Sequence, residues 1–354
     1  MKTTAKSGDD SSASGLFRVA IIGAATLKGK ELKDVLSDRS FPSQSVKLLD
    51  DEESLGQLES VGDEPTFIQS VLPEHMEGID FTFYTSDQPY TEKTWEMARH
   101  VGSEIIDLSY ALEDHADALL RAPWVEQELG QGRKAGLVSA PVVVADPAAA
   151  VLALLLVRLQ RTFPIREVNA TVFEPASERG RQGMDELHDQ TVNLLSFQQM
   201  PTAVFGTQIA FNLVSALGEE AEPSMASVEE RVLRHFRAIT GGKAPVPSLM
   251  LLQAPVFHAH TFSIHLELES TVSLGDVEAA LSGEHVQIAR TPQDDPNNVN
   301  VAGASLVQVA VRPDAQRESA YWIWVASDNL RVSACMAVEC AEDMAAMRPR
   351  GKVQ

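Results

Sequence analysis

An alternation of short apolar runs with helix-like stretches constrains the fold of this chain more than any other feature. Between Phe17 and Ala145, runs rich in apolar and β-branched residues are separated by stretches with the composition of helices. Parallel strands need crossover connections, and helices supply them in α/β proteins. We therefore predict a doubly wound parallel sheet, with strands at 18–23, 45–50, 79–85, 104–109 and 142–145.

The pattern changes after Ile165, where alternating runs become longer. They predict strands at 248–256 and 261–269, mixed with helices near 184–195 and 228–239. Such alternation is typical of an antiparallel or mixed sheet with one covered face. The apolar run 148–157 is too short to span a bilayer and predicts a buried helix.

Size and patterning predict two domains. A chain of 354 residues with 44% hydrophobic content can bury more than one core. The polar residues 1–16 lack the apolar segment of a signal peptide and are expected to form a disordered leader. A last helix over 331–347 is expected to return to the first domain.

The charge and the cysteine content argue against several classes of partner. The 29 basic and 50 acidic residues give a net charge of -21, which disfavours nucleic acid and anionic membranes. The two cysteines, Cys335 and Cys340, form neither a metal-ligand spacing nor a secreted disulfide framework. We expect a cytoplasmic protein with no nucleic-acid or membrane partner.

Seven segments carry a resemblance to a known family, and they occur in that family's order. They read VAIIGAATLKG (19–29), IDFTFY (79–84), EIIDLSYA (104–111), VVVADPAAAV (142–151), QIAFNL (208–213), PVFHAH (255–260) and SDNLR (327–331). They resemble segments of the aspartate-semialdehyde dehydrogenases and the related N-acetyl-glutamyl-phosphate reductases. The matches extend over nearly the whole chain.

The resemblance implies a specific α/β architecture. It implies a Rossmann-type, NAD(P)-binding-like domain with a doubly wound parallel sheet over 17–146, completed by the helix 331–347. It also implies an α+β dimerisation domain over 147–330, whose large mixed sheet pairs two subunits. A homodimer is therefore expected.

Ala149 occupies the position where the resemblance implies a cysteine nucleophile. The family's turn reads A-N-P-N-C-S/T, and this chain has alanine at the fifth position, in 145–150. A methyl group cannot attack an aldehyde, so the covalent step of the family is expected to be missing. His260 corresponds to the family's histidine base; the alternative is a strand histidine that is hydrogen-bonded in a half-open cleft.

The substrate-binding positions implied by the resemblance are also changed. Gln253 stands at the arginine of R-V-P-V and has neither the charge nor the bidentate fork that binds a carboxylate. Glu113 stands at the arginine that closes D-N-S-S-A-F-R, where a carboxylate is expected to repel an anion. Glu174 replaces the glutamine of Y-Q-A-x-S-G-A-G, and Glu178 and Arg179 replace the glycines that follow.

A strand-to-helix turn supplies the candidate cofactor site. Such turns bind dinucleotides because glycine lets bare backbone approach the pyrophosphate. Thr26 stands at the family's central glycine, where a β-branched residue resists positive φ and crowds the phosphate, whereas Lys28 adds a positive charge. The cofactor is therefore none or NADP, and the candidate residues are Gly23, Ala24, Thr26, Leu27, Lys28 and Gly29.

Two further constellations allow more than one interpretation. His258, His260 and His265 lie on or near one strand and could ligate zinc, but no cysteine or acid nearby completes a site, so no metal is expected. The acidic residues 50–53 follow a predicted strand, where they are either a ribose-binding acid or a solvated turn.

Two functional hypotheses follow. The first is a non-catalytic dimeric protein that acts by binding or assembly, with a second copy or an active paralogue as partner. The alternative is an NAD(P)-dependent oxidoreductase that acts on an aldehyde with altered or residual activity, uses His260, and belongs to a family of amino-acid biosynthesis.

Overall fold

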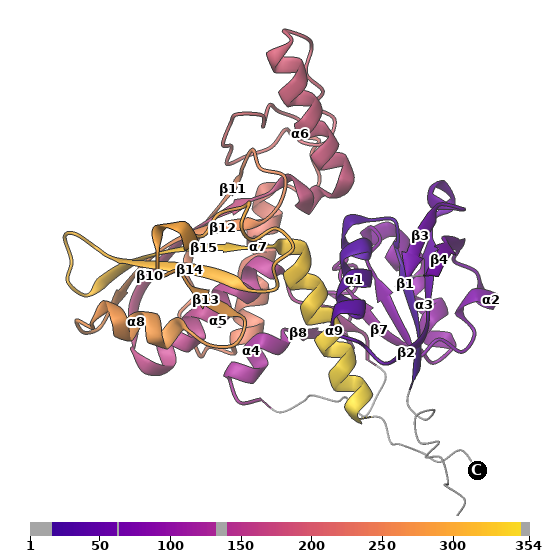
Figure 1. Cartoon of the computed structure of the whole chain (residues 1–354), viewed down its shortest axis with the longest axis horizontal. Helices are drawn as coiled ribbons and strands as arrows, with labels where there is room; N and C mark the ends of the chain where they lie inside the picture. The colour runs from indigo at the N-terminus through magenta and orange to yellow at the C-terminus, as the bar shows by residue number, and fades with distance from the viewer. Residues whose placement is uncertain (1–15, 62–63, 132–139, 348–354) are drawn as a thin grey trace, which may run out of the picture.

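The computed structural model describes residues 16–61, 64–131 and 140–347, and it has two large sheets. The first has seven strands and the second has six. In Figure 1 they lie on opposite sides of the helix α9, which spans Asn329–Met347. The predicted fold class, a parallel Rossmann-like sheet plus a mixed sheet, is confirmed.

The first sheet is parallel, and several of its strands are connected by helices, which supply the crossovers that parallel strands need. Its order is β5-β2-β1-β6-β7-β9-β8, and every paired neighbour runs parallel. Its strands are β1 (Phe17–Ile22), β2 (Ser43–Asp50), β5 (Gln69–Ser70), β6 (Phe81–Tyr84), β7 (Glu104–Asp107), β8 (Leu119–Arg121) and β9 (Val142–Val144).

Short helices and one hairpin accompany this sheet. Strands β3 (Leu58–Val61) and β4 (Glu64–Phe67) form a separate antiparallel pair. The helices are α1 (Leu27–Asp38), α2 (Pro73–Met76), α3 (Gln88–His100) and α4 (Pro123–Glu128), with a 3-10 turn η1 at Glu52–Ser54.

Helix α5 (Pro147–Thr162) connects the two sheets and is buried through most of its length. All residues from Pro147 to Leu159 are buried, in agreement with the buried helix predicted from the apolar run. A helix that is apolar on all sides is typical of the core of a larger protein. This burial fixes the position of its first turn, which contains Ala149.

The second sheet is mixed, with order β11-β10-β12-β15-β14-β13. Along β12 the residues Phe262, Ile264 and Leu266 are fully buried, whereas Ser263 and His265 on the other face are partly exposed. Helices therefore cover one face and the opposite face stays open. The elements are β10 (Ile165–Glu174), β11 (Ser248–Gln253), β12 (His260–Leu268), β13 (Val286–Ile288), β14 (Val307–Pro313), β15 (Ala320–Ser327), α7 (Met225–Thr240), α8 (Leu274–Leu281) and η3 (Pro292–Asp294).

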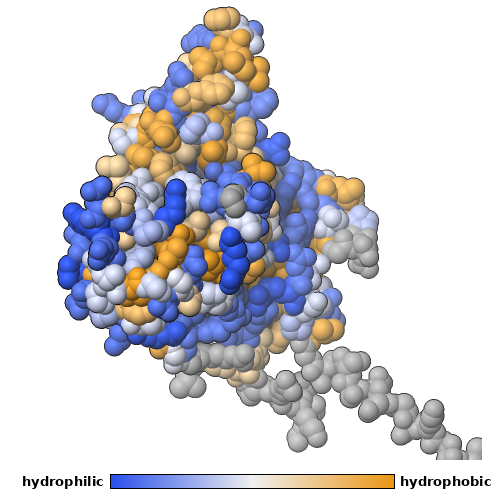
Figure 2. All heavy atoms as spheres, turned by 60° about the vertical axis from the view of Figure 1, so that its left-hand side comes forward, coloured by the Kyte–Doolittle hydropathy of each residue, from blue (hydrophilic) through white to orange (hydrophobic). Residues whose placement is uncertain are grey.

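Helix α6 (Gly180–Leu195) projects from the body as an arm (Figure 1). It follows β10 through a 3-10 turn, η2, at Ala176–Arg179. Figure 2 shows hydrophobic residues gathered on this arm. The exposed ones near its end include Val192, Leu195 and Phe197.

Helix α9, from the C-terminal part of the chain, packs against α1 beside the first sheet. Arg331 bonds Glu31 at 2.9 Å, and Arg39 bonds Glu342 at 2.7 Å. Apart from Leu16, the predicted leader lies outside the described residues, and the predicted domain boundaries stay predictions. Within the described ranges, no helix combines the length and apolarity needed to cross a membrane.

Candidate functional site

Ala149 lies in the first turn of α5 and has no solvent-exposed surface. Asp146 caps this helix, because its Oδ1 accepts hydrogen bonds from the amides of Ala148 and Ala149 at 2.9 and 3.2 Å. Cys335 and Cys340 both lie in α9, and burial raises the pKa of both thiols. Neither cysteine therefore supplies a thiolate at this turn.

His260 begins β12 and is 3% exposed. Its Nε2 lies 3.8 Å from Oε1 of Glu178, and its Nδ1 has no hydrogen-bond partner among the described residues. The ring is therefore more enclosed than the half-open cleft expected from the sequence.

Gln253 and Glu174 face each other across neighbouring strands. They are register partners in β11 and β10, and Gln253 Nε2 donates to the Glu174 carbonyl at 2.9 Å. Both are buried, and Oε1 of Gln253 has no partner in the described part of the chain. Burial and the nearby charge of Glu178 raise the pKa of Glu174 to about 8. Glu174 is therefore a neutral acid at neutral pH.

Glu113 is neutralised by α7, which corrects the expectation of a carboxylate left to repel anions. It contacts Arg231 at 3.3 Å, Arg234 at 2.8 Å and His235 at 3.0 Å. Burial alone would raise the pKa of Glu113, but the bond from His235 and the charge of Arg231 lower it to about 2. The negative charge of Glu113, at the position where the resemblance places an arginine, is thus paired inside the protein.

The backbone identifies the tautomer of His235. The amide of Asp146 donates to Nδ1 of His235 at 3.0 Å, so Nδ1 must be unprotonated. The other nitrogen, Nε2, then donates to Glu113. This chain of contacts links the cap of α5 to Glu113.

Tyr110 and Arg231 are part of the site, although no role was predicted for either. Two cations lie over the Tyr110 ring, with Lys28 Nζ at 4.8 Å and Arg231 Cζ at 4.7 Å from its centroid. Tyr110 has a φ of 67°, a strained conformation for a residue that is not glycine. The only sequence signal was its position just after a buried strand.

The turn at 23–29 is built differently from a pyrophosphate-binding turn. Thr26 has a φ of -68°, so the predicted conflict with a positive φ is wrong. Its hydroxyl donates to the Gly23 carbonyl and accepts from the Gly29 amide, and it therefore caps α1. Glycine is needed for packing at both ends, since a Cβ would lie 2.3 Å from Ser86 N at Gly23 and 2.2 Å from Gly23 O at Gly29.

Asp50 takes part of the hydrogen-bonding capacity of this turn. Its carboxylate accepts from the amides of Ala25 at 2.7 Å and Asp51 at 2.9 Å, and it is 5% exposed. Asp50 is therefore not a free ribose-binding acid, whereas Glu52 and Glu53 after it are exposed in η1, as expected for the alternative of a solvated turn. Asp50 and Thr26 thus accept from the Ala25 and Gly29 amides of this turn, and Lys28 Nζ bonds the Leu108 carbonyl at 3.2 Å, so these groups already have protein partners.

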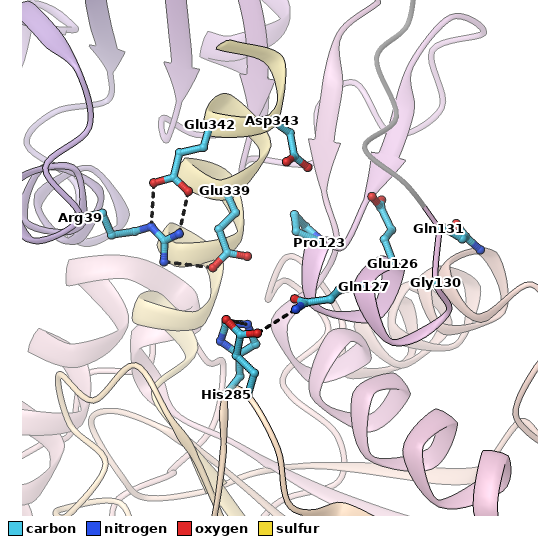
Figure 3. Close-up of a pocket in the computed structure, with 11 residues that line it drawn as sticks. Arg39, Pro123, Glu126, Gln127, Gly130, Gln131, His285, Glu339, Glu342 and Asp343 are labelled. Carbon is cyan, nitrogen blue, oxygen red and sulfur yellow. Dashed lines mark hydrogen bonds and ion pairs between the residues drawn. The ribbon is translucent and has the colours of Figure 1, made fainter. Parts of the chain in front are cut away.

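A cavity of about 520 Å³ lies away from all these residues, beside α4 and α9 (Figure 3). Five of its eleven lining residues are acidic, and two of them, Glu339 and Glu342, form ion pairs with Arg39. Among the described residues no group of three or more His, Cys, Asp or Glu could hold a metal ion. Its lining is Arg39, Pro123, Glu126, Gln127, Gly130, Gln131, Glu284, His285, Glu339, Glu342 and Asp343.

Two family models match the chain and together cover most of it. Residues 18–132 match the semialdehyde dehydrogenase NAD binding domain, and residues 156–332 match the semialdehyde dehydrogenase dimerisation domain. The chain belongs to the semialdehyde dehydrogenase family.

Similar proteins include enzymes of this semialdehyde dehydrogenase family. Aspartate-semialdehyde dehydrogenase of Rickettsia bellii is 28% identical over 334 residues, which cover 93% of this chain and 97% of the relative. A USG-1 protein homolog of Azotobacter vinelandii is 30% identical over 329 residues, with 92% and 96% covered. The structure of a probable aspartate-semialdehyde dehydrogenase from Pseudomonas aeruginosa has a TM-score of 0.83 at 27% identity, covering 92% and 98%.

The semialdehyde dehydrogenase fold brings most of the predicted site residues to one region. Glu174 and Gln253 are paired, His260 lies near Glu178, and Asp146 beside Ala149 connects through His235 to Glu113. Gly23 and Gly29 instead support the packing of α1, and only Lys28 of that turn reaches toward Tyr110.

Proposed function

We propose that this member of the semialdehyde dehydrogenase family is a non-catalytic dimeric protein that acts by binding or assembly. The observation that carries the proposal is the buried methyl group of Ala149 at the capped first turn of α5. The resemblance implies a thiolate there, which attacks the aldehyde carbon and later carries the acyl group as a thioester. Alanine has no lone pair to form that bond.

The anion-binding positions support the same proposal. Gln253 is uncharged and donates its amide protons to backbone carbonyls. Glu113 is occupied by Arg231, Arg234 and His235, so these cations are already paired. A substrate carboxylate or phosphate would have to displace an internal ion pair in a buried site, which is costly.

Restoring the sulfur alone is therefore not expected to restore turnover. The test is the NADP- and phosphate-dependent oxidation of aspartate semialdehyde by the wild-type protein and by Ala149→Cys. We expect no rate above background for either, because Gln253 and Glu113 remain. Turnover by Ala149→Cys would mean that the cleft is less altered than proposed, and turnover by the wild type would overturn the proposal.

The open face of the second sheet is the proposed homodimer surface, and an active paralogue is a second candidate for the same surface. The match of residues 156–332 to a dimerisation domain supports this assignment. We also propose a cytoplasmic location, where the buried, unpaired Cys335 and Cys340 would stay reduced.

The match to the NAD binding domain favours one competing function, an NAD(P)-dependent oxidoreductase that uses His260. The two functions differ in whether NADPH binds. We expect no change in nicotinamide fluorescence when NADPH is titrated to millimolar concentration, because Asp50 and Thr26 already accept from the Ala25 and Gly29 amides of the turn. Saturable binding would favour the oxidoreductase.

A further inference from the structure

A carboxylate from the segment between β10 and α6 points into the region beside His260. Glu178 lies in η2, and its side chain is 15% exposed. Its Oε1 accepts a hydrogen bond from Asn329 Nδ2 at 2.7 Å and lies 3.8 Å from His260 Nε2. Two backbone hydrogen bonds hold η2 against the segment that follows β11. In them, the amides of Ala176 and Ser177 donate to the carbonyls of Val256 and Phe257.

The groups around Glu178 come from separate parts of the fold and are held independently of it. Asn329 Oδ1 accepts from the Ala259 amide at 3.1 Å, so its Nδ2 is directed toward Glu178. Lys28 is held on α1 by the Leu108 carbonyl, and Arg231 is held on α7 by Glu113. An amide from the start of α9 therefore bonds this carboxylate, and the charges of Lys28 and Arg231 act on it from two other elements.

The charges in this region favour an ionised carboxylate. Burial acts to raise the pKa of Glu178, but Lys28, His260, the bond from Asn329 and Arg231 outweigh it, and the pKa lies below its ordinary value. A buried carboxylate without such partners would take up a proton instead. Glu174, which is less well compensated, shows this opposite behaviour.

We propose that the Asn329 amide and the His260 ring form a binding site for a small carboxylate, with the charges of Lys28 and Arg231 nearby, and that Glu178 fills this site as a built-in ligand. Glu178 stands where the family resemblance places glycine, so its side chain occupies space that glycine would leave open. This inference goes beyond the proposed function, because it concerns what fills the cleft and not whether the cleft turns over a substrate. The external ligands of the right chemistry are acetate and formate.

The test is chemical rescue of Glu178→Gly, measured as thermal stability in the full-length protein. We expect a lower Tm than that of the wild type, and a Tm that rises by a few degrees when acetate or formate is added in large excess, because a ligand that binds only the folded state stabilises it. Sodium chloride at the same ionic strength is the matched salt control and is expected to produce a smaller rise.

Two variants separate site binding from general effects. Glu178→Gln keeps the volume and an acceptor for Asn329 and is expected to show no acetate response. Glu220→Ala, an exposed glutamate, is expected to behave as the wild type. If Glu178→Gly is recovered folded only when acetate is present, the proposal is supported. Equal responses to acetate and chloride, an equal acetate response in the wild type, or no rescue of an unfolded Glu178→Gly would overturn it. None of these readouts depends on turnover.

Discussion

Side chains of one type carry different charges in this cleft, depending on their partners. Glu113 has two arginines and a histidine around it and stays ionised, whereas Glu174 has a carboxylate neighbour and stays protonated near neutral pH. Replacing a family glutamine by Glu174 therefore changes the hydrogen-bonding pattern more than the charge. At Glu113 the substitution adds a charge that α7 neutralises.

Glu174→Gln is predicted to change how stability depends on pH. The folded-state pKa of Glu174 is raised from 4.5 to about 8, so between these values the folded protein holds a proton that the unfolded chain has lost. The contribution of Glu174 to the stability of the folded protein is complete below the unfolded-state pKa. It decreases as the pH rises from about 4.5 to about 8. Relative to the wild type, the glutamine variant should therefore gain about 3–4 kcal/mol in unfolding free energy from about pH 5 to about pH 8.

Urea unfolding at several pH values measures this, and Glu113→Gln is the matched control. The pKa of Glu113 is lowered to about 2, so its contribution is present above the unfolded pKa and is lost only as pH falls from there toward 2. The control should be less stable than the wild type throughout the upper window, by an amount that does not vary with pH. A pH-independent effect of Glu174→Gln would contradict the assignment of a neutral Glu174.

Single-residue expectations succeeded where a property depends on the residue alone and failed where it depends on distant partners. The absence of a sulfur at Ala149 can be read from the chain. The partners of Glu113 lie on α7, more than a hundred residues away, and periodicity does not show them. Thr26 has a negative φ because it caps α1. The comparison with a glycine-containing turn predicted a positive φ there and missed this cap.

The first turn of α5 is the element that links the site to the core. Its cap, Asp146, satisfies two amides that have no partner inside the helix, and its own amide fixes the ring of His235. The cap is 5% exposed, so water does not replace it freely. This side chain therefore adds to the burial of α5 in fixing the position of Ala149.

Asp146→Ala is predicted to destabilise the protein by about 1–2 kcal/mol, because two buried amides lose their acceptor. Asp146→Asn keeps an acceptor oxygen and should cost less than half as much. The unfolding free energies of both variants, from urea titration, check the prediction. Equal losses in the two variants would mean that the charge of Asp146, and not its cap, is what matters.

Elements were predictable where burial makes a run uniformly apolar. The strands β1 and β9 and the helix α5 are examples, because their apolar sequences favour a buried element. Strand β8 was missed because it has only three residues and ends in Arg121, a buried arginine paired with Glu126. The hairpin β3–β4 was missed because its short strands are partly polar and pair only with each other.

At the scale of the molecule, the second sheet leaves one face without helices. Register places Met250, Thr171, Ser263, Trp324 and Ala310 in one row across this face. Trp322, in a neighbouring row, is 43% exposed. A surface of this kind, with aromatic side chains and few charges in its centre, is typical of a protein interface.

Ser263→Arg is predicted to convert a dimer into a monomer, because it places an unpaired charge at the centre of this face. Sedimentation velocity at micromolar concentration measures the change. Gln57→Arg, an exposed position beside the first sheet, adds the same charge and should leave the dimer intact. A monomeric wild type, or dissociation of both variants, would contradict the assignment of this face as the dimer surface.

The central claim, that the chain cannot form an acyl-enzyme, is tested most directly by intact-mass spectrometry of the purified protein. The protein is incubated with aspartate semialdehyde and NADP in the absence of phosphate, so that any thioester persists, beside a family member that carries the cysteine. We predict no mass increase for this chain, because Ala149 offers no nucleophile and Cys335 and Cys340 are buried with raised thiol pKa values. An acyl adduct on this protein would contradict the account.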